Sequence, residues 1–187
     1  MGASRQGGLR GEPLSTPPDW TGAQTGFWSW GRPRSPMSPT ARLVLLGHAA
    51  ATAYMMGLIW FVHVVHYPLF AGVGELGYAA YQAEHMRLTG FVVGPPMVLE
   101  MLGALWLAFE LPPALPRWMP LTGALLVFGI WASTALFSVP AHNGLLLGFD
   151  AEVHASLCDT NLLRTLLWTL RTALVGWMIA RLIPTES

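Results

Sequence analysis

The feature that most constrains this chain is a set of four hydrophobic segments, at about residues 43–66, 88–111, 118–139 and 161–183. Each segment is close to the ~20 residues that an α-helix needs to cross about 30 Å of hydrocarbon. The first segment contains no Arg, Asp or Glu. The sequence therefore predicts an all-α fold, an integral membrane four-helix bundle.

Composition separates this interpretation from a soluble helical bundle. Only 11% of the 187 residues are charged and 53% are hydrophobic, whereas an average soluble domain carries about 25% charged residues. The net charge is zero and no stretch is densely basic, so we expect the lipid bilayer, and no nucleic acid, as a partner. The single Cys158 excludes an intramolecular disulfide and a cysteine-rich metal site.

Residues 1–40 differ in composition from the rest of the chain. They are rich in Gly, Pro and Ser and show no apolar periodicity, so they bury too little surface to offset the entropy lost on ordering. We predict a disordered N-terminal extension over residues 1–40 and a four-helix transmembrane domain over residues 41–184. Met37 stands directly before the first hydrophobic segment, and we regard it as an alternative start of translation.

The distribution of arginine predicts the orientation of the spans. Four spans place both termini on one side of the membrane, together with the turn at residues 112–117. The side with the termini holds Arg5, Arg10, Arg32, Arg34, Arg42, Arg117 and Arg181. The connections on the other side hold fewer arginines, with Arg87 among them. Because arginine is enriched in cytoplasmic connections, we predict a multi-pass protein of the bacterial inner membrane with both termini in the cytoplasm.

Polar side chains gather at the non-cytoplasmic end of the predicted bundle, where they end or open the spans. They are His63, His66, His85, Arg87, His142, Asn143, Asn161 and Arg164. So many histidines at one end of a small bundle exceed what solubility requires, and we predict a functional polar cavity there. We assign catalytic roles to His63, His85, His142 and Arg164. His48 lies near the opposite end of the first span, and we interpret it as unrelated to this cavity.

The fourth span carries a second polar pattern. Asn161, Arg164, Trp168 and Arg171 are spaced three, four and three residues apart, which places them on one stripe of a helix. Arg171 lies about 15 Å along the helix from Asn161, at a depth similar to that of Glu100 in the second span. Because charges buried in a membrane usually pair, we predict a Glu100–Arg171 contact. We assign a substrate-binding or supporting role to Glu100, Asn161, Trp168 and Arg171.

Histidine and arginine allow several chemistries at this end of the bundle. Two histidines at i, i+3 can ligate a metal, and imidazole suits iron, copper and zinc. Histidines on different helices can also ligate a haem. We therefore consider a metal set of His63, His66 and His142, with haem, iron or copper as the cofactor. The sequence has no HExxH or CxxC motif, and the arginines also suit an anionic or quinone-like small-molecule substrate.

Each of these residues also has a purely structural interpretation. A histidine near a helix end is more often a polar residue at the membrane surface than a ligand, and His66 stands before Tyr67 and Pro68, a natural helix terminus. Arg164 satisfies backbone carbonyls or extends to the interface. Because His63 lies one turn further inside the helix, we rank His63 above His66 as a functional residue.

Four stretches of the sequence resemble a group of bacterial four-span membrane proteins of unknown function. The stretches are FVHVVHYPLF, YAAYQAEHMRLTGFVVGPPMVLE, VPAHNGLLLGFD and TNLLRTLLWTLR, and the resemblance covers about residues 43–175. In length and span count this group is similar to anthrone-oxygenase-like families. The resemblance implies a cofactor-poor oxygenase that acts on an aromatic or polyketide-like substrate.

Three functional hypotheses follow. The first is a small membrane oxidoreductase or oxygenase with a polar site of histidine and arginine. The second is a non-enzymatic subunit or assembly component of a membrane complex, whose polar core specifies a homo-oligomer or a contact with a partner. The third is transport or proton relay through the Glu100–Arg171 layer. Metal content, absorbance and a fixed co-purifying partner distinguish the first two.

Overall fold

The structure is a computed structural model that describes residue 2, residues 38–110 and residues 115–182. The predicted disordered extension therefore lies outside the described residues for nearly all of its length, as does the alternative start at Met37. The first helix begins at Pro39, two residues inside the range predicted for the extension.

Helices make up all the regular secondary structure within the described residues. Their bounds are α1 Pro39–Phe61, η2 Val62–His66, η3 Pro68–Gly72, η4 Glu75–Gly77, α2 Tyr78–Glu110, α3 Trp118–Ser133, η5 Thr134–Ser138, α4 Val139–Leu145 and α5 Ala151–Ala180. The segments η2 and η5 are π-helical, and η3 and η4 are 3-10 helical. The helices α1, α3 and their continuations, with α2 and α5, form four long rods.

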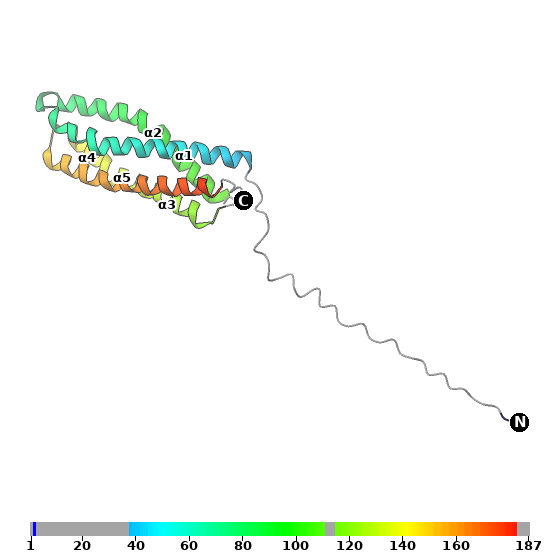
Figure 1. Cartoon of the computed structure of the whole chain (residues 1–187). Coiled ribbons are helices and arrows are strands. Elements are labelled where there is room, and N and C mark those ends of the chain that lie inside the picture. Colours follow the sequence, from blue (N-terminus) through cyan, green and yellow to red (C-terminus); the bar gives the residue numbers. More distant parts are fainter. Residues whose placement is uncertain (1, 3–37, 111–114, 183–187) are drawn as a thin grey trace. The chain divides into compact units, whose positions relative to one another are not determined.

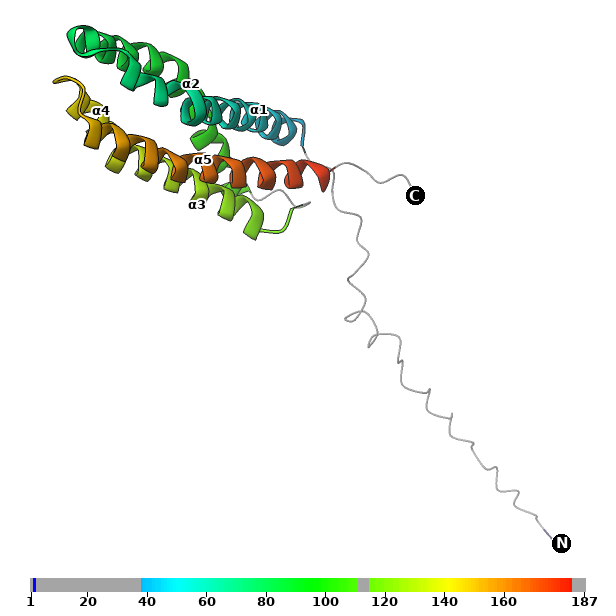
Figure 2. The same cartoon turned by 60° about the vertical axis from the view of Figure 1, so that its left-hand side comes forward.

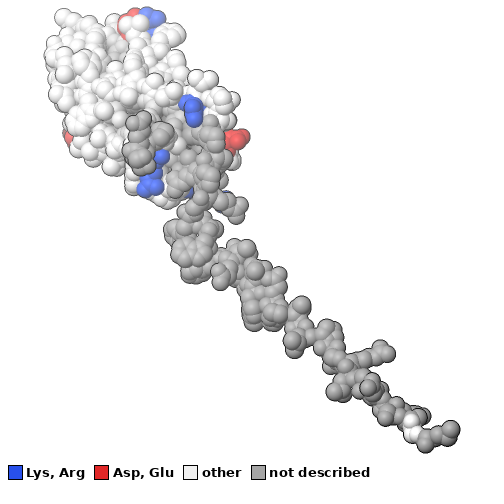
Figure 3. All heavy atoms as spheres, turned by 45° about the vertical axis from the view of Figure 1, so that its right-hand side comes forward, with Lys and Arg blue, Asp and Glu red and all other residues white. Residues whose placement is uncertain are grey.

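These rods lie side by side as a bundle (Figures 1 and 2). The helix α1 packs against α2 and α5, and α3 packs against the same two helices, so α1 and α3 lie across the bundle from each other. Each rod is long and apolar enough to cross a membrane: Pro39–Gly72, Glu75–Glu110, Trp118–Leu145 and Ala151–Ala180. The described face in Figure 3 accordingly shows few charged side chains. The predicted four-helix bundle is confirmed.

The helices extend beyond the spans predicted from hydrophobicity. Residues 67–87 and 140–160 are polar connections that we expect from their helical spacing to be partly helical, and α2 indeed begins at Tyr78 and α5 at Ala151. The Asp150 carboxylate caps α5, because it accepts hydrogen bonds from the N–H groups of Glu152 and Val153, both at 2.9 Å. The end of the bundle where α1 meets α2, called here the histidine end, is therefore helical rather than looped.

Two apolar clusters fill the interior of the bundle. The cluster nearer the histidine end includes Met55, Ile59, Phe70, Tyr78, Met97, Ile130, Leu145, Leu157 and Trp168. The other cluster consists of Leu45, Leu107, Leu115, Met119, Leu174 and Met178, with partly buried neighbours. Buried polar side chains on α1, α2 and α5 lie between the two clusters along the chain, at His48, Glu100 and Arg171.

Gly103 on α2 provides a test of how tightly this polar layer is packed. A Cβ atom at position 103 would lie 2.7 Å from His48 Nδ1, and the His48 ring is held by Arg171 on its other side. Gly103→Ala should therefore lower the free energy of unfolding by about 1–3 kcal/mol, the usual cost of overpacking. The measurement is unfolding by SDS titration in mixed micelles.

Gly57→Ala is the matched control for this substitution. Gly57 is also helical, but a Cβ atom there would meet nothing within 4 Å. Alanine favours a helix more than glycine does, so this variant should be neutral or slightly stabilised. Equal destabilisation of the two variants would contradict a close contact between Gly103 and His48.

Candidate functional site

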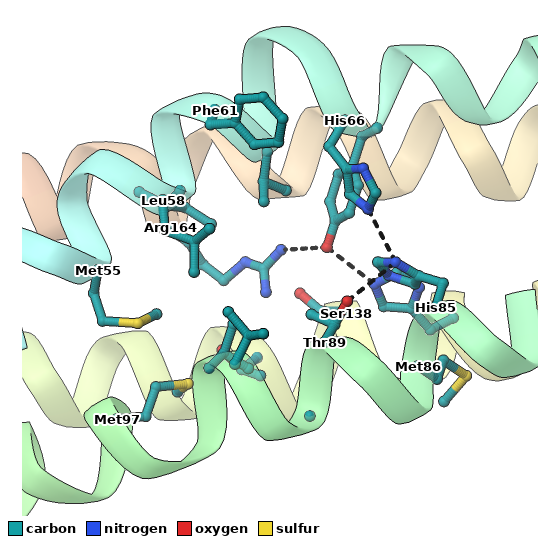
Figure 4. Close-up of a pocket in the computed structure, with 18 of the residues that line it drawn as sticks. Met55, Leu58, Phe61, His66, His85, Met86, Thr89, Met97, Ser138 and Arg164 are labelled. Atoms are coloured by element: carbon teal, nitrogen blue, oxygen red, sulfur yellow. Dashed lines mark hydrogen bonds between the residues drawn. The ribbon is translucent and has the colours of Figure 1, made fainter.

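A cavity of about 340 Å³ lies between the helices near the histidine end. Most of its wall is apolar and comes from α1 and α2. Its polar side chains come from all four rods: His66, Tyr67, His85, Thr89, Thr134, Ser138, His142 and Arg164. Figure 4 shows His66, His85, Thr89, Ser138 and Arg164 converging on one region. A mostly apolar cavity with a few convergent polar groups is typical of a small-molecule site.

Both π-helical segments contribute to this cavity. The segment η2 ends at His66, and the wide turn is closed by a hydrogen bond from Tyr67 N–H to the Val62 carbonyl at 3.0 Å. The segment η5 supplies Thr134 and Ser138. π-helical turns are rare and are frequent at functional sites. Two of them beside one cavity therefore support its functional role.

The hydrogen bonds of His142 determine which of its nitrogens carries the proton. Gln82 Nε2 lies 2.9 Å from His142 Nδ1 and 3.2 Å from the His142 carbonyl oxygen. A carbonyl oxygen only accepts, so the amide NH₂ group of Gln82 faces it and donates to both atoms. His142 Nδ1 is then an acceptor, and the neutral ring carries its proton on Nε2. This N–H donates to Tyr67 Oη, 2.9 Å away.

The Tyr67 hydroxyl group accepts a second hydrogen bond, from Arg164 Nη2 at 3.3 Å. Because Tyr67 Oη accepts from both His142 and Arg164, its own proton remains available for donation. Tyr67 is buried and lines the cavity, so a molecule in the cavity is the natural acceptor of that proton. The same two donors would stabilise negative charge on Oη or on a nearby ligand oxygen.

His66 and His85 form a second polar pair beside Tyr67. His66 Nε2 lies 3.0 Å from His85 Nδ1, and Thr89 Oγ1 lies 3.1 Å from the same nitrogen. The ring centroids of His85 and His142 are 5.1 Å apart. The three imidazoles are therefore contiguous along one side of the cavity.

Two buried polar atoms on residues of the cavity wall lack a hydrogen-bond partner among the described residues. They are Ser138 Oγ and Arg164 Nε. The other end of the Arg164 guanidinium group is held by Asn161 Oδ1, 2.5 Å from Nη2, so its position is fixed. Buried polar groups are rarely left unpaired in proteins. Ser138 Oγ and Arg164 Nε therefore leave hydrogen-bonding capacity at this end of the cavity that the described residues do not use.

A second polar cluster lies deeper in the bundle, around Arg171. Arg171 Nε donates to Glu100 Oε1 at 3.2 Å, and both side chains are fully buried. Arg171 Nη2 lies 3.0 Å from His48 Nε2 and donates to it, while Nη1 donates to the Gly123 carbonyl oxygen. The predicted Glu100–Arg171 contact is confirmed. His48, which we interpreted as unrelated to the polar cavity, belongs to this deeper cluster.

Trp168 connects the two polar regions. Its indole Nε1 donates to Glu100 Oε2 at 2.9 Å, and its side chain also lines the cavity. The Glu100 carboxylate is thus satisfied by Arg171 on one oxygen and by Trp168 on the other. Trp168 forms the floor of the cavity, and the Glu100–Arg171 ion pair lies directly behind it.

The structure does not bring His63 to the cavity. His63 packs edge-on against Trp60, with ring centroids 6.4 Å apart, and it is not among the lining residues. The α1 and η2 residues that face inward recur at intervals of four, three and four: Met55, Ile59, Val62 and His66. The geometry therefore favours His66 over His63, the reverse of the order inferred from depth.

The metal set inferred from the sequence is not assembled either. Within residues 38–110 and 115–182, no three His, Cys, Asp or Glu side chains are placed to hold one metal ion. The proposed ligands His63, His66 and His142 do not meet, because His63 lies off the cavity. By contrast, the catalytic candidates His85, His142 and Arg164 all line it.

Two residues of the site were not singled out from the sequence. Tyr67 resembles an ordinary aromatic residue at the membrane surface, and Gln82 lies in a stretch whose helical spacing predicts a helix along the membrane surface. A helical signal was present for Gln82, because Gln82, His85 and Thr89 are spaced three and four residues apart. No comparable pattern identifies Tyr67, whose role depends on contacts across the bundle.

Comparisons of the chain with protein-family models, with curated proteins and with solved structures found no match. Function therefore has to be argued from the site itself, because a four-helix fold supports many activities. The site consists of an apolar cavity, a tyrosine with an available proton, an arginine and three contiguous histidines.

Proposed function

We propose that the chain is an integral membrane enzyme that exchanges protons with a small, largely apolar molecule carrying a phenolic or carbonyl oxygen. The reaction class that we propose is that of an oxidoreductase or oxygenase. The observation that carries the proposal is the convergence of Tyr67, His142 and Arg164 on one apolar cavity. An apolar wall favours an apolar ring, and the three polar groups orient its oxygen.

The hydrogen bonds at Tyr67 support proton transfer in either direction. A carbonyl oxygen near Tyr67 Oη accepts its proton, and the Arg164 guanidinium group stabilises the charge that develops. In the reverse direction, a Tyr67 phenolate that accepts hydrogen bonds from Arg164 and His142 removes the proton of a phenol. The ligand is then an electron-rich anion, which is easier to oxidise than the neutral phenol.

The oxygenase class follows from this activation and from the resemblance in length and span count to anthrone-oxygenase-like families. With dioxygen as the oxidant, a ring CH₂ group of an anthrone-like substrate becomes a carbonyl group. One oxygen atom enters the product, and the other leaves as water with the two hydrogens of the CH₂ group. Tyr67 and Arg164 serve this reaction by removing the first proton and stabilising the resulting anion.

We further propose that the protein lies in the bacterial inner membrane with both termini in the cytoplasm. This orientation is supported by Arg42, Arg117 and Arg181, which lie at the ends of helices opposite the histidine end. In this orientation the cavity lies in the outer half of the membrane.

Binding of two probes of matched shape tests the role of Tyr67. 1-Naphthol and naphthalene differ by one hydroxyl group, and we expect the wild-type protein in nanodiscs to prefer 1-naphthol by about tenfold, the effect of one additional hydrogen bond. Tyr67→Phe should remove this preference, because it deletes the hydroxyl group that contacts His142 and Arg164. Isothermal titration, corrected with empty nanodiscs, measures both affinities. Tyr54→Phe, half-exposed on α1, should keep the preference.

Oxygen consumption with an anthrone tests the reaction class on the same variants. Tyr67→Phe should slow the reaction by about 10²–10⁴-fold, the range for loss of a proton-transfer group, whereas Tyr54→Phe should react at the wild-type rate. Equal binding of 1-naphthol and naphthalene would contradict the proton-donating site. A preference for 1-naphthol without oxygen uptake would contradict only the oxygenase class. Co-purification with a fixed partner and no activity would favour a non-enzymatic subunit instead.

A further inference from the structure

We infer that the ligand enters this cavity sideways from the hydrocarbon region of the bilayer, and that it is an alkylated phenol or quinol with its tail in the lipid. The inference rests on the proposed function, because it names the class of molecule that the same cavity takes. It follows from which walls of the cavity are closed, which are thin, and where the polar groups lie.

The histidine end of the cavity is closed by buried aromatic and aliphatic side chains. Phe70, Tyr78, Leu145 and Leu157 all have no exposed surface. The Phe70 ring lies over the histidines, with centroids 4.9 Å from His85 and 5.2 Å from His66. The segment η3 that carries Phe70 is tied to α5, because His154 Nε2 donates to the Tyr67 carbonyl oxygen at 2.8 Å. These side chains therefore cover much of the cavity at this end, which disfavours entry of a molecule dissolved in water.

The opposite end of the cavity is closed by the deeper polar cluster. Trp168 forms the floor, and Glu100 and Arg171 directly behind it are fully buried. These side chains fill the centre of the bundle between α2 and α5. Passage along the bundle axis would require the ion pair to separate, so the cavity is not one part of a continuous channel through the described residues.

The side of the cavity between α1 and α2 is thin and apolar. Phe61 on α1 is 52% exposed, and Leu88 and Val92 on α2 are 49% and 45% exposed, yet all three also line the cavity. A single layer of side chains thus separates the cavity from the outer surface of the bundle. Figure 4 shows Phe61 and Leu58 on the α1 side of the cavity. These residues lie within the apolar spans, so the surface outside this wall faces lipid chains.

The order of groups along the cavity matches the order of groups in a lipid. His66, Tyr67 and His85 lie at the end of α1 and near the beginning of α2, closer to the end of the bundle. The apolar rim of Leu88 and Val92 lies about one to two turns deeper along α2. A molecule with a polar ring and an apolar tail lies in a bilayer with its ring nearer the surface and its tail deeper, which is the same order. It can place its ring at Tyr67 while its tail remains among the lipid chains.

Two phenols of different tail length test this inference. The probes are 4-butylphenol and 4-dodecylphenol, added to the full-length protein in nanodiscs and compared at equal mole fraction in the bilayer. Wild-type protein should bind 4-dodecylphenol at least as tightly as 4-butylphenol, because the longer tail leaves through the rim. Leu88→Trp narrows the rim and should weaken 4-dodecylphenol binding by about tenfold, with a much smaller effect on 4-butylphenol.

Leu99→Trp is the matched control, because Leu99 is exposed on the same helix but does not line the cavity. It should leave both affinities unchanged. Val92→Phe narrows the same rim by a smaller volume and gives the same comparison where Leu88→Trp fails to fold. Binding of 4-butylphenol together with exclusion of 4-dodecylphenol from wild-type protein would overturn the lateral path and leave the proposed function standing. Failure of both phenols to bind would overturn the proposed function itself.

Discussion

Replacement of Arg171 by leucine should lower the free energy of unfolding by about 3–5 kcal/mol, the cost of breaking a buried ion pair by removing one partner. The Glu100 carboxylate would remain fully buried with Trp168 as its remaining side-chain donor. The Gly123 carbonyl oxygen and His48 Nε2 would also lose their hydrogen bonds from the Arg171 guanidinium group. SDS titration in mixed micelles, followed by circular dichroism, measures the loss.

Two further variants distinguish this effect from the loss of any charge. Arg87→Gln removes a surface ion pair with Glu84, whose side chains are both more than half exposed. It should leave stability unchanged, because exposed pairs contribute little. The double variant Glu100→Leu/Arg171→Leu should be more stable than Arg171→Leu alone, since it leaves no unpaired charge in the core. The loss in the double variant should therefore be smaller than the sum of the losses measured for Glu100→Leu and for Arg171→Leu. A loss equal to that sum would contradict direct coupling of Glu100 and Arg171.

Phe70→Ala should destabilise the protein by a similar amount, about 3–5 kcal/mol, the usual effect of truncating a buried phenylalanine. Phe70 is fully buried and lies over the histidine pair. Its removal should also admit water to the buried His85 ring, which is 8% exposed, so that His85 becomes accessible to diethyl pyrocarbonate. Mass spectrometry after brief exposure to the reagent measures this modification. Phe109→Ala, on the exposed surface of α2, should change neither stability nor modification.

The two effects of Phe70→Ala have separate meanings. A loss of stability with no increase in histidine modification would show that Phe70 is not the cap that separates the histidines from water. Increased modification at unchanged stability would show that the cap is present but contributes little to folding. The lateral path into the cavity depends on the modification measurement, because the path requires the histidine end to be closed.

The sequence was sufficient to predict the fold class and the ion pair, for the same physical reason. Hydrophobic length determines where helices cross a membrane, and a charge deep inside such a helix has to find a partner. Glu100 and Arg171 lie at similar depths on different spans, and each span contains few alternatives. Depth and helical spacing together therefore identified the contact without any knowledge of how the helices pack.

The residues that line the cavity could be identified only from the structure, because lining depends on which way each side chain faces. Depth along the helix favoured His63, whereas the inward stripe of α1 and η2 contains His66 and excludes His63. The role of Tyr67 depends on hydrogen bonds from α4 and α5, which no local pattern encodes. Gln82 was not singled out because a polar residue in a stretch of helical spacing is also typical of a helix at the membrane surface, whereas in the structure it is fully buried and contacts His142.

The buried Arg171 has a consequence for how the protein enters a membrane. The helix α5 is the least apolar of the four spans, and arginine near the middle of an inserting helix costs about 2.5–3.5 kcal/mol. This helix is also the last of the four to be synthesised. By the time it leaves the ribosome, α1, α2 and α3 already carry the groups that accept from Arg171, so the most costly segment inserts when its acceptors are already in place. The same α5 placed first in a membrane-inserting chain would meet the lipid with its arginine unpaired.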